Sequence, residues 1–131
     1  MINKIPKVLI IDDDKFLLNM YSIKFSKNGF EVNSATSGEE ALNKIKEGYN
    51  PDIILLDIVM PGMDGFDVLN TLKKDKIAPN AQVIMLTNQG QLSDIEKAKS
   101  IGINGFIIKA TTIPSEVVEE VTKIYNSQTP A

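Results

Sequence analysis

The feature that most constrains this chain is a fivefold alternation of short apolar runs with longer stretches of helical pattern. Four of the runs hold three or four mostly branched apolar residues each: Val8–Ile11, Ile53–Leu56, Val83–Leu86 and Phe106–Ile108. Runs this short and without polar alternation are typical of strands buried on both faces of a sheet. The segment Phe30–Ser34 alternates apolar and polar residues instead, which suits an edge strand.

Between these runs, apolar residues recur every three or four positions, as they do in amphipathic helices. The predicted apolar stripes are Phe16, Leu17, Met20 and Ile23; Ala41, Leu42 and Ile45; Phe66, Leu69 and Leu72, with Val68 close beside them; Leu92, Ile95 and Ala98; and Val117, Val118, Val121, Ile124 and Tyr125. Ser37 and Asp64 are predicted N-caps. Helix ends are predicted at Asn28-Gly29 and Gly48, and Pro114 lies near the start of the last helix.

Strand and helix therefore alternate five times, a (βα)₅ order. This order predicts an α/β fold with one doubly wound parallel sheet, right-handed crossovers and helices on both faces. The 131 residues suit one domain, 1–131, with a core of about 7–125 and a short frayed tail at 127–131. In such a sheet, ligands bind at the carboxyl ends of the strands, near the point where the strand order reverses.

Composition excludes several kinds of function. The net charge is −3 and no Lys/Arg-rich block is present, so we expect no nucleic-acid partner. The absence of cysteine and histidine rules out disulfides, thiolate or imidazole zinc sites, catalytic triads and a phosphohistidine within this chain. No apolar stretch approaches the roughly 18 residues of a membrane span, and none resembles a signal peptide. We therefore expect a cytoplasmic protein without membrane association.

Polar side chains follow four of the five predicted strands. These are Asp12, Asp13 and Asp14 after the first strand, Asp57 after the third, Thr87 after the fourth and Lys109 after the fifth. Each residue alone is more simply explained as a helix cap or a solvated side chain. Because parallel strands share one direction, however, all of these groups are expected to meet at one edge of the sheet.

The chemistry of this set fits phosphoryl transfer. Converging carboxylates repel one another and need a cation, and oxygen ligands favour Mg²⁺, with Mn²⁺ as a substitute. The Asp57 carboxylate can act as a nucleophile and form an acyl phosphate. The transferred group then needs positioning and positive charge, which Mg²⁺ and the Lys109 ammonium can supply, while the Thr87 hydroxyl can donate a hydrogen bond to it.

With these residues assembled, the chain resembles bacterial response-regulator receiver domains of the stand-alone, chemotaxis type. The most specific stretch is Asp57-Ile58-Val59-Met60-Pro61-Gly62-Met63-Asp64-Gly65, which matches the family pattern D-x-x-M-P-x-M-D-G. The resemblance extends from Lys7 to about Tyr125. It implies a flavodoxin-like sheet with strand order 2-1-3-4-5.

The resemblance also implies a role for each acidic residue. Asp13 is expected to bind Mg²⁺ directly and Asp12 through water. Asp57 is expected to be both the phosphoacceptor and a metal ligand, and the main-chain carbonyl of Val59 is expected to be a further ligand. Asp14 is better explained as the N-cap of the first helix.

By the same resemblance, Thr87 and Lys109 contact the phosphoryl group. Phe106 occupies the aromatic switch position, whose ring turns inward as Thr87 moves toward the phosphoryl group. The alternative for Phe106 is an ordinary buried aromatic residue.

Two positions depart from the family pattern. Ala110 stands where a cis proline is usual, and since a cis bond without proline costs about 3–4 kcal/mol, we expect a trans bond after Lys109. Asn88 is larger than the usual residue beside the site, so it either narrows access to the pocket or points to solvent. Val59 and Gln89 occupy positions where side chains can orient or block the attacking water, and valine offers no hydrogen bond, so unusually fast self-dephosphorylation is not expected.

We therefore predict a phosphorelay switch rather than a true enzyme, phosphorylated by a histidine kinase or histidine phosphotransfer protein. Its output is expected to use the face formed by Leu92–Ile101, Phe106–Lys109 and Glu116–Asn126, as a monomer or a phosphorylation-dependent dimer. The main alternative is a pseudo-receiver that binds partners without phosphorylation. An aspartate-nucleophile phosphatase is disfavoured, because Val59 stands where its second carboxylate would be needed.

Overall fold

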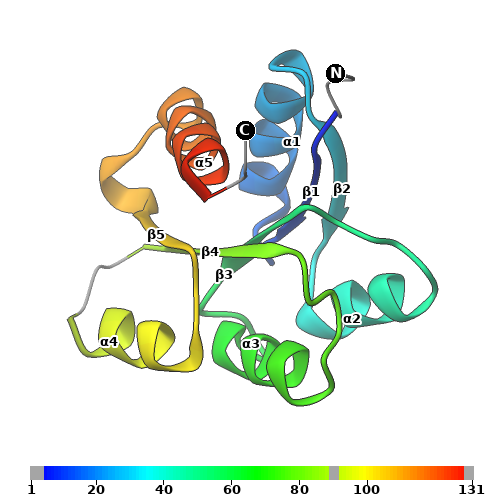
Figure 1. Cartoon of the computed structure of the whole chain (residues 1–131). Helices are drawn as coiled ribbons and strands as arrows, with labels where there is room; N and C mark the ends of the chain where they lie inside the picture. Colours follow the sequence, from blue (N-terminus) through cyan, green and yellow to red (C-terminus); the bar gives the residue numbers. More distant parts are fainter. Residues whose placement is uncertain (1–4, 89–91, 129–131) are drawn as a thin grey trace.

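Five parallel strands form the centre of the described chain, which comprises residues 5–88 and 92–128 of a computed structural model. The strands are β1 (Lys7–Ile11), β2 (Glu31–Ala35), β3 (Ile53–Asp57), β4 (Gln82–Thr87) and β5 (Gly105–Ile108). Their order across the sheet is β2-β1-β3-β4-β5, so the predicted parallel sheet and its strand order are confirmed (Figure 1). The order reverses at β1, which lies between β2 and β3.

Helices follow all five strands in the described residues. They are α1 (Lys15–Lys27), α2 (Gly38–Lys46), α3 (Gly65–Lys74), α4 (Leu92–Ile101) and α5 (Pro114–Gln128), and the short 3₁₀ turn η1 (Lys109–Thr111) joins β5 to α5. In Figure 1, α1 and α5 cover one face of the sheet, and α2, α3 and α4 cover the other. None of these described helices combines the length and the apolar character that a membrane span requires.

The alternation of side chains along each strand divides the core into two halves. In β1, Leu9 and Ile11 pack on the side of α2, α3 and α4, whereas Val8 and Ile10 pack on the side of α1 and α5. All four side chains are at most 1% exposed, because β1 is covered on both faces. β3 and β4 are buried in the same way, so the predicted burial of these three runs is confirmed.

The buried face of α1 differs from the predicted stripe. Phe16 is 73% exposed and Ile23 is 46% exposed, whereas Leu18, Tyr21 and Phe25 pack against the sheet. Both rows of residues have helical spacing, so periodicity alone could not choose between them. Phe25 decides the orientation, because its fully buried ring fills the core on the side of α5.

Two sheet edges also differ in detail from the prediction. β5 pairs only with β4, and of its run Phe106–Ile108 only Ile107 is buried, so the prediction of burial on both faces is wrong there. β2 begins at Glu31 rather than at Phe30, whose ring instead packs edge-on against Phe25 with centroids 5.0 Å apart.

On α4, Leu92 is exposed although it belongs to the predicted stripe.

The predicted helix caps are present. The Asp14 carboxylate accepts hydrogen bonds from the main-chain N–H groups of Phe16 and Leu17 at the start of α1. The Ser37 hydroxyl accepts from the N–H of Glu40 in α2. Asp64 and Asp67 form a reciprocal capping box at α3.

The last helix is longer than predicted. α5 continues to Gln128, two residues into the segment 127–131 that was expected to be a tail. The Gln128 amide donates to the Asn104 carbonyl at 3.0 Å, and the Asn104 amide donates to Gln128 Oε1 at 2.5 Å. Because these bonds tie the last turn to the segment before β5, Ser127 and Gln128 belong to the helix.

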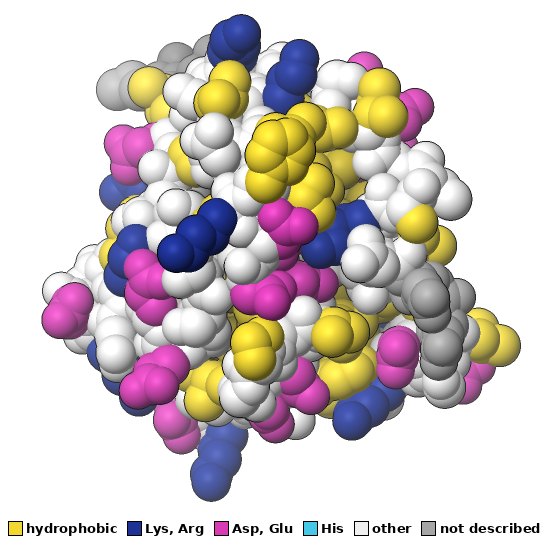
Figure 2. Space-filling view, turned by 180° about the vertical axis from the view of Figure 1, so that it is seen from behind, with side chains coloured by type: hydrophobic (Ala, Val, Ile, Leu, Met, Phe, Trp, Pro, Cys, Tyr) yellow, Lys and Arg dark blue, Asp and Glu magenta, His cyan; other side chains and the backbone are white. Residues whose placement is uncertain are grey.

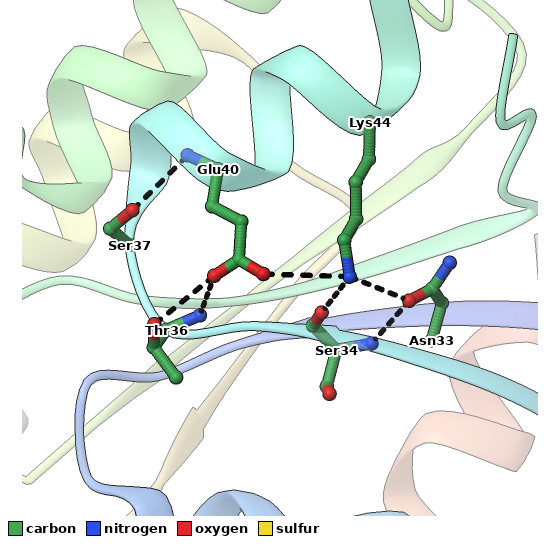
Figure 3. A network of polar contacts seen from close by, with 6 residues as sticks. All are labelled: Asn33, Ser34, Thr36, Ser37, Glu40 and Lys44. Carbon is green, nitrogen blue, oxygen red and sulfur yellow. Dashed lines mark hydrogen bonds and ion pairs between the residues drawn. The ribbon is translucent and has the colours of Figure 1, made fainter. Parts of the chain in front are cut away.

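A polar network covers the outer edge of β2 (Figure 3). Glu31 and Ala35 bond to β1 and its flanks, so strand alternation turns the N–H and C=O of Ser34 away from the sheet. Lys44 Nζ donates to the Ser34 carbonyl at 2.5 Å and to Asn33 Oδ1 at 2.9 Å, and Asn33 Oδ1 also accepts from the Ser34 N–H at 2.9 Å. Both outward groups of Ser34 are therefore satisfied by side chains.

The assignment of the buried face of α1 can be tested with two phenylalanines on the same helix. We expect Phe25→Ala to lower the free energy of unfolding by about 3–5 kcal/mol, because it leaves a cavity in the core. Phe16→Ala is expected to change it by less than about 0.5 kcal/mol. Urea unfolding followed by circular dichroism measures both, and comparable losses would support the originally predicted stripe.

Candidate functional site

A pocket of about 270 Å³ lies at the carboxyl ends of the strands. It is lined by Asp12, Asp13, Asp14, Leu17, Asp57, Val59, Asn88 and Lys109. These residues follow β1, β3, β4 and β5 or end them, so residues up to 97 positions apart in sequence meet at one edge of the sheet. Figure 2 shows acidic side chains gathered near the centre of this face, beside a recessed basic one.

Three carboxylates and one ammonium form the centre of the pocket. Oxygen atoms of Asp12, Asp13 and Asp57 lie within 4.8 Å of one another. Lys109 Nζ lies 3.0 Å from Asp12 Oδ2 and 3.4 Å from Asp57 Oδ2, and only 6% of the Lys109 side chain is exposed. The carboxylates exceed the ammonium by two negative charges, and the donors are all oxygen. This set fits one hard divalent cation such as Mg²⁺.

The three aspartates that follow β1 have different surroundings. Asp12 is fully buried, and its Oδ1 accepts a hydrogen bond from the Asp14 N–H at 3.0 Å. Asp13 is exposed, yet its carboxylate still reaches the cluster. Asp14 uses its carboxylate to cap α1, as predicted, and does not belong to the three-carboxylate cluster.

The loop after Asp57 depends on two glycines. Gly62 has a φ of +76°, a left-handed conformation that favours glycine, and it follows Pro61, whose ring fixes φ, so this pair shapes the loop. Gly65 begins α3, and its N–H donates to the Ile58 carbonyl at 2.8 Å. A Cβ atom on Gly65 would lie 2.8 Å from Ile58 Cα and closer still to the Asp57 carbonyl oxygen. Sequence reasoning missed this role, although Gly65 ends the recognised motif.

The two predicted switch residues lie on neighbouring strands. Thr87 ends β4 and is buried, while Phe106 lies in β5 opposite Met85 and packs partly against the core on the α4 side. Thr87 and Met85 point to the same face of β4, since they are two residues apart. The structure thus places Thr87 and Phe106 on one side of the sheet.

The departures from the family pattern leave Lys109 in the pocket. The bond between Lys109 and Ala110 is trans, as predicted, because the described residues contain no cis peptide. Lys109 nevertheless reaches Asp12 and Asp57. Asn88 is exposed and lines the pocket at its rim, and Val59 lies there with its side chain turned to solvent. Gln89 lies outside the described residues.

Burial sets the protonation of the central groups. It raises the pKa of Asp57 to about 6; the Lys109 ammonium opposes this shift, and the Asp12 carboxylate adds to it. Burial alone would lower the pKa of Lys109, but its hydrogen bond to Asp12 and the charge of Asp57 outweigh that effect, so this pKa is raised above 10.5. Lys109 is therefore a permanent cation at neutral pH, and Asp57 binds a proton more readily than an ordinary aspartate.

The sheet is doubly wound and parallel, and it carries clustered aspartates and a buried lysine at its carboxyl edge. Together these features define a class of α/β proteins with a charged pocket at the topological switch point. The chain matches the response regulator receiver domain over residues 8–122. It belongs to that family, whose members bind Mg²⁺ at an acidic cluster of this kind.

Curated relatives and solved structures agree with this assignment. The chain is 40% identical over 119 residues to the chemotaxis protein CheY of Thermotoga maritima, covering 90% of this chain and 96% of that one. It is 37% identical over 121 residues to CheY of Bacillus subtilis, covering 92% and 98%. The structure of Vibrio cholerae CheY4 matches with a TM-score of 0.84 at 26% identity, covering 92% of this chain and 99% of that one.

Other relatives are longer than this chain. The heme response regulator HssR of Staphylococcus epidermidis is 41% identical over 116 residues, and the match covers 88% of this chain but 48% of that protein. The part of these relatives that matches this chain is therefore the receiver domain.

The raised pKa of Asp57 predicts a pH-dependent stability. The folded chain binds a proton at Asp57 more tightly than the unfolded chain does. The contribution of this carboxyl group to the free energy of unfolding is therefore fully present below about pH 4 and is lost as the pH rises through about 6. At pH 7 without divalent ions, Asp57→Asn is expected to be more stable than the wild type by about 2–3 kcal/mol, and the difference should shrink toward pH 4.

Urea unfolding in EDTA across this pH range measures the difference. Asp75→Asn removes an exposed carboxylate outside the pocket and controls for the loss of one negative charge. If the two variants follow the same curve against pH, Asp57 is not the source of the effect.

Proposed function

We propose that this chain is a phosphorelay receiver that accepts a phosphoryl group on Asp57 in the presence of Mg²⁺. The observation that carries the proposal is the buried Lys109 ammonium, which lies within 3.4 Å of both Asp12 and Asp57 beside a cluster of three carboxylates. Membership of the receiver family supports a role in two-component signalling. Such a domain works as a switch, with only self-catalysed phosphorylation and dephosphorylation, and we do not propose a turnover enzyme.

The transfer itself can be described atom by atom. A carboxylate oxygen of Asp57 attacks the phosphorus of a phosphohistidine, the new O–P bond forms as the P–N bond breaks, and the departing imidazole takes up a proton. The donor histidine lies outside residues 1–131, because these contain no histidine. We propose a histidine kinase or a histidine phosphotransfer protein as that donor.

The remaining work is divided between residues of the pocket and Thr87, which ends β4 directly before the pocket residue Asn88. The Lys109 ammonium neutralises charge on one phosphoryl oxygen, and the Thr87 hydroxyl donates a hydrogen bond to another. Mg²⁺ held by Asp13, Asp57 and the Val59 carbonyl, and by Asp12 through water, would supply further positive charge to the phosphoryl oxygens; Mn²⁺ offers a similar coordination.

An exposed apolar row on α1 supports docking of the donor next to the pocket. Phe16 and Ile23 are largely exposed and lie on one side of the helix with the half-exposed Met20. The helix starts at the pocket, since Asp14 and Leu17 line it. A partner helix bundle that covers this row would bring its phosphohistidine to the mouth of the pocket.

The output is proposed to run through the face of α4, β5 and α5. Phe106 lies on β5 within this face and is paired with Met85 of β4, two residues before Thr87. It therefore connects the end of β4 near the pocket with the face of α4, β5 and α5. A movement of Thr87 toward the phosphoryl group would leave room for the Phe106 ring on the α4 side. We propose that a cytoplasmic protein target reads this change, or that a second copy does so in a phosphorylation-dependent dimer.

The proposal predicts stable phosphorylation at one residue. Incubation with acetyl phosphate and Mg²⁺ is expected to add one phosphoryl group to the wild type, read by intact mass, and none to Asp57→Asn. Lys109→Gln is expected to slow incorporation by on the order of 100-fold, the usual effect of losing one charged stabilising group. Asp75→Asn serves as the matched carboxylate control and is expected to react like the wild type.

No mass gain in the wild type under these conditions would instead favour the alternative, a pseudo-receiver that binds partners without phosphorylation. Incorporation that persists in Asp57→Asn would place the acceptor elsewhere.

The lifetime of the phosphoryl group provides a separate test. Val59 lies at the rim of the pocket and has no hydrogen-bonding group to orient water. We expect Val59→Asn to shorten the lifetime of the aspartyl phosphate several-fold, because an amide can position the attacking water. Loss of the phosphoryl mass with time measures this, and an unchanged decay would dismiss a role for this position.

A further inference from the structure

We propose that this chain has a second binding site, for a small amphipathic anion, at the end of the sheet opposite the acidic pocket. A cavity of about 320 Å³ lies where α3 ends and β4 begins. It is lined by Leu72, Lys73, Lys76, Ile77, Ala78, Pro79, Ala81 and Val83. Its volume falls within the range of small-molecule sites, about 300–1,000 Å³.

The walls of the cavity are apolar and continuous with the core. Leu72 and Val83 are almost completely buried, and Ile77, Ala78 and Ala81 pack against the same half of the core. No acidic residue lines the cavity. The interior of the site therefore favours a hydrocarbon or aromatic group over a polar one.

The charge at the rim is positive and uncompensated. Lys73 and Lys76 both line the cavity and are exposed, and within the described residues neither forms an ion pair. Lys73 Nζ extends over the turn that follows α4, since a Cβ atom built on Gly102 would lie 3.4 Å from it. An apolar floor below two free ammonium groups suits a ligand that carries a ring or branched chain and one anionic group.

The backbone of the loop shapes the wall of the cavity. Lys76 has a φ of 54° because it closes α3: the Ile77 N–H donates to the Leu72 carbonyl at 3.0 Å, a bond typical of a helix that ends in a left-handed residue. Ala78 has a φ of 47°, in the left-handed region that residues with a Cβ atom seldom adopt, and such a conformation persists only where the surroundings hold it. Here both residues line the cavity, and Ile77 between them points its side chain toward the core.

The site is tested with two fluorescent probes of similar shape. Anilinonaphthalene sulfonate carries an anionic group, and phenylnaphthylamine has the same aromatic rings without it. We expect the wild type to bind the sulfonate more tightly than the neutral amine. In the double variant Lys73→Gln, Lys76→Gln, sulfonate binding should weaken by about three- to tenfold, as for the loss of two exposed charge interactions, with amine binding unchanged.

Two further variants complete the design. Lys46→Gln with Lys123→Gln removes two exposed lysines outside the cavity and is the matched charge control. Ala81→Leu narrows the cavity and should weaken the binding of both probes, provided that circular dichroism shows the variant to be folded. If it does not fold, the comparison of the two double-lysine variants decides the test. Amide chemical shifts should change at Ile77, Ala78 and Val83 when the sulfonate is added.

Equal sulfonate affinity in the two double-lysine variants would overturn the proposal. So would chemical-shift changes confined to another surface, such as the pocket beside β5, because the probe would then report a different apolar patch. These outcomes are independent of the proposed phosphorylation, since every variant used here leaves the acidic pocket unchanged.

Discussion

The buried ammonium of Lys109, held between Asp12 and Asp57, is the interaction on which the rest of the site depends. Buried like charges repel, and the three clustered carboxylates can share one small pocket only if positive charge joins them. That cation comes from the end of β5, three strands along the sheet from β1, so β1, β3, β4 and β5 have to pair before it arrives. Fold and site are therefore specified together: residues 12 and 109 meet only once these four strands are in place.

Two glycines allow the close packing that positions Lys109 and Asp57 in the pocket. Gly105 begins β5, and a Cβ atom there would lie within 3.3 Å of the Ile124 side chain, so α5 packs closely against the start of the strand. Gly65 has the same effect at Asp57, because its lack of a side chain lets α3 begin in contact with the main chain of residues 57 and 58. In both places a glycine allows the close packing that sets the position of a charged group.

The fold and the meeting of Asp12, Asp13, Asp57 and Lys109 in one pocket were predictable, because parallel strands with polar residues at their ends leave few arrangements. The errors have a common cause. On α1, two rows of apolar residues share the helical spacing, and only the space available to Phe25 in the folded core decides which row is buried. β5 was expected to be buried on both faces because its short apolar run resembles a central strand, yet it lies at the edge. The end of α5 depends on hydrogen bonds between Asn104 and Gln128, 24 positions apart, which local patterns do not reveal.

The coverage of Ser34 by Lys44 and Asn33 bears on how copies of this protein can associate. An outer strand with free main-chain groups is a template on which another chain can add a strand. At β2 that template is interrupted, since a second chain would first have to displace the lysine and the amide that already satisfy Ser34. Growth of the sheet from the β2 edge is thus opposed by one partly exposed lysine, Lys44.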